Sequence, residues 1–184
     1  APAYLPGLLG RNCAIERDFL QRAGGFAAPA PTGTDYVLAH ELVAAGARIR
    51  QVRTSQVETE YPANARAYIR QRRRWLRNVA VHGLRYRARG DVYSSLTTSF
   101  AGMAMLALPF TSLRFGAAAL SVWFPMLVGG WLARLRYLRF AHLVRGWPFS
   151  VRHSMALLLV LLLDFVAWAA PLLDYLQPAS REKW

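Results

Sequence analysis

The last third of the chain contains an apolar run that is long enough to cross a lipid bilayer. Residues 154–173 are almost entirely apolar, and residues 157–163 are all Leu or Val. A membrane-spanning helix needs about 20 such residues. Two shorter apolar segments, 97–113 and 116–133, come before this run. The pattern predicts a transmembrane region of about three spans within residues 96–176, followed by a tail at 177–184.

Positive charge is high for a chain in which 54% of the residues are hydrophobic, because 23 Lys and Arg stand against 10 Asp and Glu. The two properties rarely coexist in a soluble domain, but they fit basic loops that alternate with apolar spans. Arginines gather between the second and third apolar segments, at Arg134, Arg136, Arg139, Arg145 and Arg152. Basic loops favour the cytoplasmic side of a membrane. The chain is therefore predicted to be a multi-pass membrane protein.

The first two spans are predicted to form a hairpin, turned at Arg114 and Phe115. Both ends of this hairpin would then be cytoplasmic, because each is flanked by arginines. A re-entrant or interfacial first segment is the alternative, since a turn this tight leaves few residues outside the bilayer.

Residues 63–95 form a basic region that is predicted to be an amphipathic helix at the membrane surface. Nine arginines lie between 63 and 89, interleaved with apolar residues such as Ile69 and Leu76. This pattern suits a helix whose charges face phosphates or water. It equally fits a non-enzymatic membrane protein that binds anionic lipids through its arginines. Nucleic acid is not expected as a partner, because membrane spans follow directly.

The first 62 residues have the pattern of a mixed α/β region. The predicted elements are strands at 10–15 and 48–60 and helices at 16–23 and 36–45. Gly24 and Gly46 are expected to end the two helices, because glycine tolerates the backbone that closes a helix. Thr34 is the expected N-cap of the second helix, with Asp35 in its first turn.

A series of short motifs runs through the chain in a fixed order. The sharpest is Gln71-Arg72-Arg73-Arg74-Trp75, which fits the pattern Q-x-x-R-W. Before it come G-x-N-x-A and G-G-F within residues 10–26, T-D-x-x-L at 34–38 and E-x-P at 60–62. With these motifs the chain resembles the membrane-integrated family-2 glycosyltransferases, the group of the cellulose, chitin, hyaluronan and poly-N-acetylglucosamine synthases.

The resemblance implies an inverting transferase with an α/β GT-A-type catalytic domain on the cytoplasmic face of a cell membrane, most often a bacterial one. Residues 1–62 would be the C-terminal part of that domain. The implied partners are a nucleotide-sugar donor, a growing polysaccharide or glycolipid acceptor, and membrane lipids. The implied cofactor is Mg²⁺ or Mn²⁺, but no Asp-x-Asp occurs in the sequence. The chain is therefore expected to be a C-terminal fragment, inactive alone, whose metal ligands lie mostly outside it.

The resemblance also assigns roles to four residues. Asp35 would be the catalytic base that deprotonates the acceptor hydroxyl, and a helix N-terminus favours its negative charge. Arg74 and Gln71 would bind the donor pyrophosphate, since a guanidinium stabilises developing phosphate charge. Trp75 would stack on the acceptor sugar. No residue is assigned to a metal. The alternatives are a helix-capping Asp35, a lipid-bound Arg74 and an interfacial Trp75.

Two positions stand apart from this pattern. Thr34 occupies the place where the family has Glu, which removes a supporting carboxylate and raises the hypothesis of a degenerate relative. Asp164 lies inside the strongest apolar run. An ionisable group at such a position is costly and marks a functional candidate. It is expected either to line a polymer path or to pair with a neighbouring helix.

Overall fold

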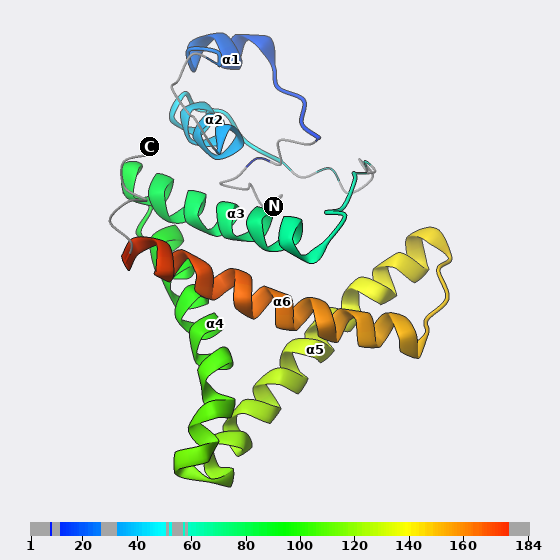
Figure 1. The fold of residues 1–184 in the computed structure, drawn as a ribbon. Coiled ribbons are helices and arrows are strands. Elements are labelled where there is room, and N and C mark those ends of the chain that lie inside the picture. The colour runs from blue at the N-terminus through cyan, green and yellow to red at the C-terminus, as the bar shows by residue number, and fades with distance from the viewer. Residues whose placement is uncertain are drawn as a thin grey trace. The chain divides into compact units, whose positions relative to one another are not determined.

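The computed structural model describes residues 8, 12–26, 33–50, 52, 57 and 59–176, with side chains described as far as 172. All regular structure in these residues is helical (Figure 1). The elements are α1 (Arg17–Arg22), α2 (Thr34–Ala44), α3 (Ala65–Arg85), α4 (Arg89–Phe115), α5 (Ala117–Arg145) and α6 (Val151–Leu176).

The chain divides into two compact units. The first contains the described residues up to 62 together with 74–95, and the second contains 63–73 and 96–176. The helices α3 and α4 each contribute residues to both units. The predicted basic region at 63–95 is therefore shared between the two.

The strands predicted at 10–15 and 48–60 are not found in the described residues of those segments. Residues 13–16 and 47–50 have no regular structure. A strand exists only when its backbone forms a ladder of hydrogen bonds with a neighbour, and the described residues form none. The prediction of an α/β region is therefore not supported by this part of the chain, which is entirely helical.

The helix ends of the first unit depend on glycine, as predicted. The helix α1 is followed by Gly24 and Gly25, both in the left-handed conformation. At the end of α2, Gly46 has a φ of 89°, and the N–H of Ala47 bonds to the Leu42 carbonyl at 2.9 Å. The prediction of Thr34 as N-cap is wrong by one residue. The cap is Gly33, which has a φ of 68°, and Thr34 is the first helical residue.

The basic region forms α3 and the start of α4. Asn64 caps α3, since its side-chain oxygen accepts a hydrogen bond from the Ala67 N–H at 2.9 Å. A short turn separates the two helices, and the start of α4 packs against the second half of α3. The Ser95 hydroxyl donates to the Leu76 carbonyl at 2.9 Å. Gly83 permits this approach, because a Cβ there would lie 3.0 Å from Val92 Cγ2.

Three helices are long and apolar enough to cross a membrane, as predicted: Arg89–Phe115, Ala117–Arg145 and the stretch Val151–Leu172 of α6. The hairpin between α4 and α5 turns at Gly116, which has a φ of 61°. Four of the five arginines predicted to form a linker lie instead on α5, which ends only at Arg145, and the fifth, Arg152, lies in the first turn of α6. Arginine is a good helix former, and Gly146, with a φ of 66°, is the first residue that ends the helix.

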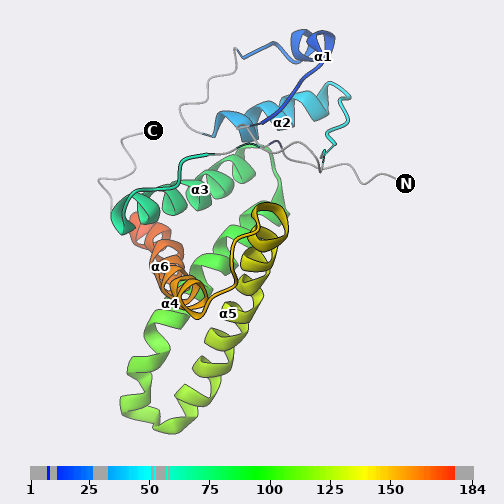
Figure 2. The ribbon, with the colours of Figure 1, turned by 90° about the vertical axis from the view of Figure 1, so that its right-hand side faces the viewer.

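The second unit is held together by an apolar core and close helix contacts (Figure 1 and Figure 2). Met105, Leu161 and Phe165 are buried, one from α4 and two from α6. The Trp123 indole N–H donates to the Met105 carbonyl at 2.9 Å and joins α5 to α4. Gly102 allows α4 to approach α6, because a Cβ there would come within 2.7 Å of Trp168 Cβ.

Candidate functional site

Asp35 lies in the first turn of α2 and is exposed. One of its carboxylate oxygens accepts a hydrogen bond from the Tyr36 N–H at 3.0 Å. Val37, two residues later, is 2% exposed. Asp35 lies at the start of α2, before the buried residues Val37, Ala39 and Leu42, and its side chain is exposed. A carboxylate in this position is accessible to a ligand.

The neighbour of Asp35 attaches the start of α2 to α3 and α4. The Tyr36 hydroxyl donates a short hydrogen bond to the Asp91 carboxylate of α4. Its ring stacks on His82 of α3 with a centroid distance of 5.7 Å. Burial, and then the Asp91 carboxylate, raise the pKa of Tyr36 well above its usual value. Tyr36 therefore stays protonated and keeps donating at any ordinary pH.

One turn further along, α2 makes a second contact with α3. The His40 ring stacks on Tyr86 with a centroid distance of 4.6 Å and an interplanar angle of 6°. The Tyr86 hydroxyl donates to Glu41 Oε1 at 2.9 Å. These contacts give His40 and Tyr86 a structural role. Together with Tyr36, they fix the orientation of α2 and hence the direction of Asp35.

Gly33 lies directly against α3. A Cβ at this position would be 2.8 Å from His82 Nε2 and 3.4 Å from the Asn78 side chain. Asn78 comes four residues after Arg74, which corresponds to a rise of about 6 Å along the helix. The first turn of α2, which carries Asp35, therefore lies against the segment of α3 that follows Arg74 and Trp75.

Substitution of Gly33 by Ala is expected to destabilise the first unit by about 2–4 kcal/mol. About 1 kcal/mol comes from the left-handed backbone, and the rest from overlap with His82. Gly46→Ala is the matched control, because Gly46 has a φ of 89° but no atom within 4 Å of an added Cβ. Thermal unfolding of the purified variants measures the difference. Equal shifts for both variants would contradict the contact with His82.

The three predicted motif residues lie on α3, within two turns of one another. Gln71 is half-buried, whereas Arg74 is exposed and Trp75 is 39% exposed. Gln71 and Trp75 are four residues apart and share one face of the helix. Asp35 and Arg74, both described, form no ion pair with each other. The Asp35 and Arg74 side chains are thus both exposed to a ligand.

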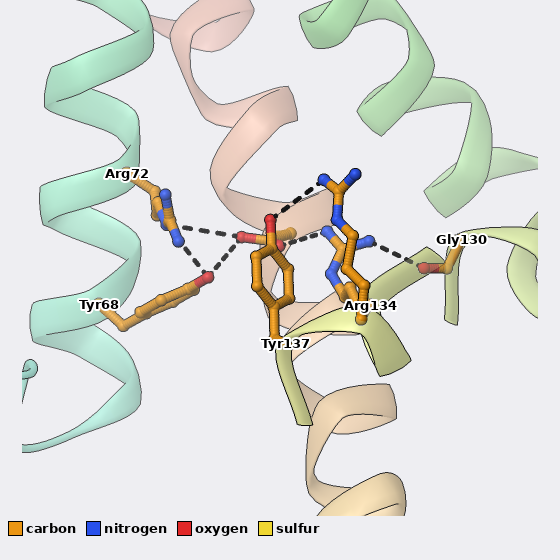
Figure 3. A network of polar contacts seen from close by, with 7 residues as sticks. Tyr68, Arg72, Gly130, Arg134 and Tyr137 are labelled. Atoms are coloured by element: carbon orange, nitrogen blue, oxygen red, sulfur yellow. Dashed lines mark hydrogen bonds and ion pairs between the residues drawn. The ribbon is translucent and has the colours of Figure 1, made fainter. Parts of the chain in front are cut away.

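A buried polar network surrounds Asp164, which is 8% exposed in its side chain. The Tyr68 hydroxyl donates to Asp164 Oδ1 at 2.6 Å, and Arg134 Nη2 donates to Asp164 Oδ2 at 2.5 Å. Arg72 Nε donates to the Tyr68 hydroxyl at 3.1 Å and lies 3.9 Å from Asp164 Oδ1. Figure 3 shows Tyr68 and Arg72 on one side of the network and Arg134 on the other. Of the two roles expected for Asp164, the structure supports pairing with neighbouring helices.

The partners of Asp164 are not evident from the sequence. Arg134 falls in the predicted linker, and Tyr68 and Arg72 fall in the predicted basic helix. One signal was available, since Tyr68 and Arg72 are four residues apart and so share a helix face. Nothing in the sequence indicated that this face would meet a carboxylate 92 positions after Arg72.

The described residues contain no group of three or more His, Cys, Asp or Glu side chains arranged to hold a metal ion. The divalent cation implied by the resemblance therefore has no ligand set in this part of the chain. Asp35 can still accept a proton, and the arginines can still bind anions.

Comparisons with known proteins agree with the motifs. A search of curated proteins and a search of solved structures each returned no match. The family model described as "Glycosyl transferase family group 2" matches residues 3–173, which is nearly the whole chain. The match covers Asp35, the Q-x-x-R-W motif and the three candidate membrane helices. The chain therefore belongs to family group 2 of the glycosyl transferases.

Proposed function

We propose that this chain carries the catalytic base and the acceptor-side motif of an inverting hexosyltransferase. The enzyme moves a sugar from a nucleotide-sugar donor to a growing polysaccharide or glycolipid at the cytoplasmic face of the membrane. The observation that carries the proposal is the placement of Asp35. It is an exposed carboxylate in the first turn of α2, and Gly33 holds that turn against α3 beside Asn78.

In the proposed reaction, Asp35 accepts the proton of an acceptor hydroxyl as that oxygen attacks the anomeric carbon. The bond from the anomeric carbon to the nucleoside diphosphate breaks on the opposite face, so the configuration inverts. Tyr36 supports this role, because its contacts with Asp91 and His82 hold the start of α2 in place. A base held in a fixed direction loses less entropy when the reactants align.

The roles proposed for the motif follow from chemistry and exposure. Arg74 offers a forked guanidinium to the pyrophosphate, where negative charge builds as the diphosphate leaves. Gln71, one turn before Trp75, donates to the same group through its amide. Trp75 offers an exposed indole face to the apolar face of the acceptor sugar. All three can be reached from one side of α3, because Arg74 and Trp75 follow Gln71 at the i+3 and i+4 positions of the helix.

Two further parts of the proposal extend past the helices. The GT-A-type sheet of the family would be formed by residues other than 13–16 and 47–50, which have no regular structure. The Mg²⁺ or Mn²⁺ ion would be held mainly by residues outside these 184. When bound, the cation neutralises phosphate charge on the donor.

A second function, binding of anionic lipids without catalysis, is favoured by one observation. Arg66, Arg70 and Arg74 are all exposed and are spaced four residues apart along α3. Such a stripe matches a phosphate-bearing surface. Thr34 stands in place of the family's Glu, and this substitution also favours a relative that has lost activity.

One experiment separates the two functions. The protein as its gene encodes it is expressed in membranes and supplied with a panel of nucleotide sugars and a divalent cation. The transferase hypothesis predicts release of nucleoside diphosphate and a product whose anomeric configuration is opposite to that of the donor. Absence of release with every nucleotide sugar, together with binding to vesicles that contain anionic lipid, would favour the second function.

A further inference from the structure

Asp164 lies where three helices meet. Its oxygen Oδ1 accepts from Tyr68 of α3, and its oxygen Oδ2 accepts from Arg134 of α5, while Asp164 itself belongs to α6. One carboxylate thus joins two other helices, using a different oxygen for each. All of these residues belong to the second unit.

The network satisfies the groups that it buries. A charged side chain inside an apolar helix bundle is costly unless it is paired and hydrogen-bonded. Arg134 pairs with the carboxylate, donates from Nη1 to the Gly130 carbonyl at 3.2 Å, and lies 5.6 Å from the centre of the Trp168 ring. The positive charge of Arg134 already balances the negative charge of Asp164. The contact between Asp164 and α3 is therefore not needed for charge neutrality and must have another role.

Tyr68 is the direct contact between α3 and Asp164. It is 4% exposed, its hydroxyl donates to Asp164, and the same hydroxyl accepts from Arg72 Nε. Burial, and then the hydrogen bond to Asp164, raise the pKa of Tyr68, and Arg72 opposes the rise only partly. Tyr68 therefore remains a neutral donor. The Arg72 guanidinium also lies over the Tyr68 ring, 5.2 Å from its centre.

Arg72 is the second residue of the Q-x-x-R-W motif, and Gln71 comes immediately before it. Because α3 is one continuous helix, fixing residues 68–72 also fixes the directions in which the other motif side chains project from α3. The contact is thus made at the start of the motif itself, where a small rotation of α3 would move every motif side chain.

We infer that Asp164 is a positioning residue for the transferase reaction, acting through Tyr68 and Arg72 to hold the start of the Q-x-x-R-W helix on the membrane helices α5 and α6. The inference rests on the proposed function. It assigns the buried carboxylate to alignment of the motif and not to the path of a polymer.

Tyr68→Phe tests the inference with the smallest change, since it removes the hydroxyl and leaves the ring. Tyr137→Phe is the matched control, because Tyr137 is an exposed tyrosine of α5 whose hydroxyl meets only the Arg136 guanidinium, at 3.4 Å. We expect kcat/KM per folded protein to fall about tenfold in Tyr68→Phe, mainly through kcat, because misaligned groups lose contacts that form in the transition state. The control should stay within about twofold of wild type.

Asp164→Asn adds a double-mutant test. If Tyr68 acts through Asp164, adding Tyr68→Phe to Asp164→Asn should lower kcat/KM by less than about twofold further. A purely structural role would reduce the yield of folded protein and leave kcat per folded molecule unchanged. Additive effects of the two substitutions, or a Tyr68→Phe variant equal to the control, would overturn the inference. Should Asp164→Asn fail to fold, the Tyr68→Phe comparison still decides.

Hydrogen exchange of the α3 amides at 65–73 separates this inference from the proposed function. Anchoring predicts faster exchange in Tyr68→Phe than in Tyr137→Phe, whether or not the protein transfers sugar. Unchanged exchange in Tyr68→Phe would overturn the anchoring of α3 even in an active enzyme. A wild-type protein that transfers no sugar would overturn the proposed function and the positioning role of Asp164. Faster exchange in Tyr68→Phe would still establish that the Tyr68 hydroxyl anchors α3.

Discussion

Replacement of Asp35 by Asn is expected to reduce sugar transfer by about 10³-fold, within the range that a general base contributes. Asn cannot accept the proton of the acceptor hydroxyl. Its amide oxygen can still accept the hydrogen bond that the Tyr36 N–H now gives to Asp35 at 3.0 Å. The loss should therefore fall on kcat, with little change in the amount of protein in the membrane.

Asp18→Asn is the matched control for this substitution. Asp18 is also exposed and also lies in the first turn of a helix, α1. The two substitutions remove the same charge from equivalent helix positions, so any effect of the helix dipole is shared. Initial rates of nucleoside diphosphate release, divided by the amount of folded protein, measure the difference. Equal activity in both variants would assign Asp35 to helix capping and remove it as the base.

The interpretation of such a result depends on α2 staying in place. The aromatic contacts of Tyr36 and His40 hold α2 in place. Neither contact involves the Asp35 carboxylate. A loss of activity with an unchanged unfolding temperature would therefore report on proton transfer and not on the fold.

Local signals in the sequence were enough to predict helices in these segments and the ends of α1 and α2, but not the break between α3 and α4 or the end of α5. Glycines that adopt a left-handed backbone end α1, α2 and α5, and such ends depend on one or two residues. The three apolar helices can be predicted from the length and the composition of their segments alone. The family was predictable for a similar reason, since its motifs are short and keep their order along the chain.

The network at Asp164 was not predictable, because it depends on packing between distant residues. The sequence shows a buried charge within an apolar run and leaves its partners undefined. Arg134 becomes a partner only because α5 continues past the apolar segment, which places its guanidinium within reach of the carboxylate. The predicted strands are not found in the described residues for a related reason, because a strand needs a neighbouring strand and these residues form none.

The second large effect is expected at Arg74. Arg74→Ala should lower kcat by about 10²–10³-fold, comparable to the loss of one group that stabilises transition-state charge. Arg74→Lys should recover only part of the activity, because an ammonium group gives a point charge and not a forked pair of hydrogen bonds. The KM for the donor should rise less than kcat falls, since the pyrophosphate gains its charge as the bond breaks.

Arg70→Ala tells catalysis apart from lipid binding. Arg70 is exposed and lies one turn before Arg74 on the same stripe of α3, so both guanidinium groups can reach the same membrane surface. If the stripe only binds anionic lipid, the two substitutions should weaken binding to anionic vesicles equally and have similar effects on activity. If Arg74 binds the donor, only Arg74→Ala should abolish transfer. The two vesicle affinities should then stay similar, because each variant loses one charge from the same stripe.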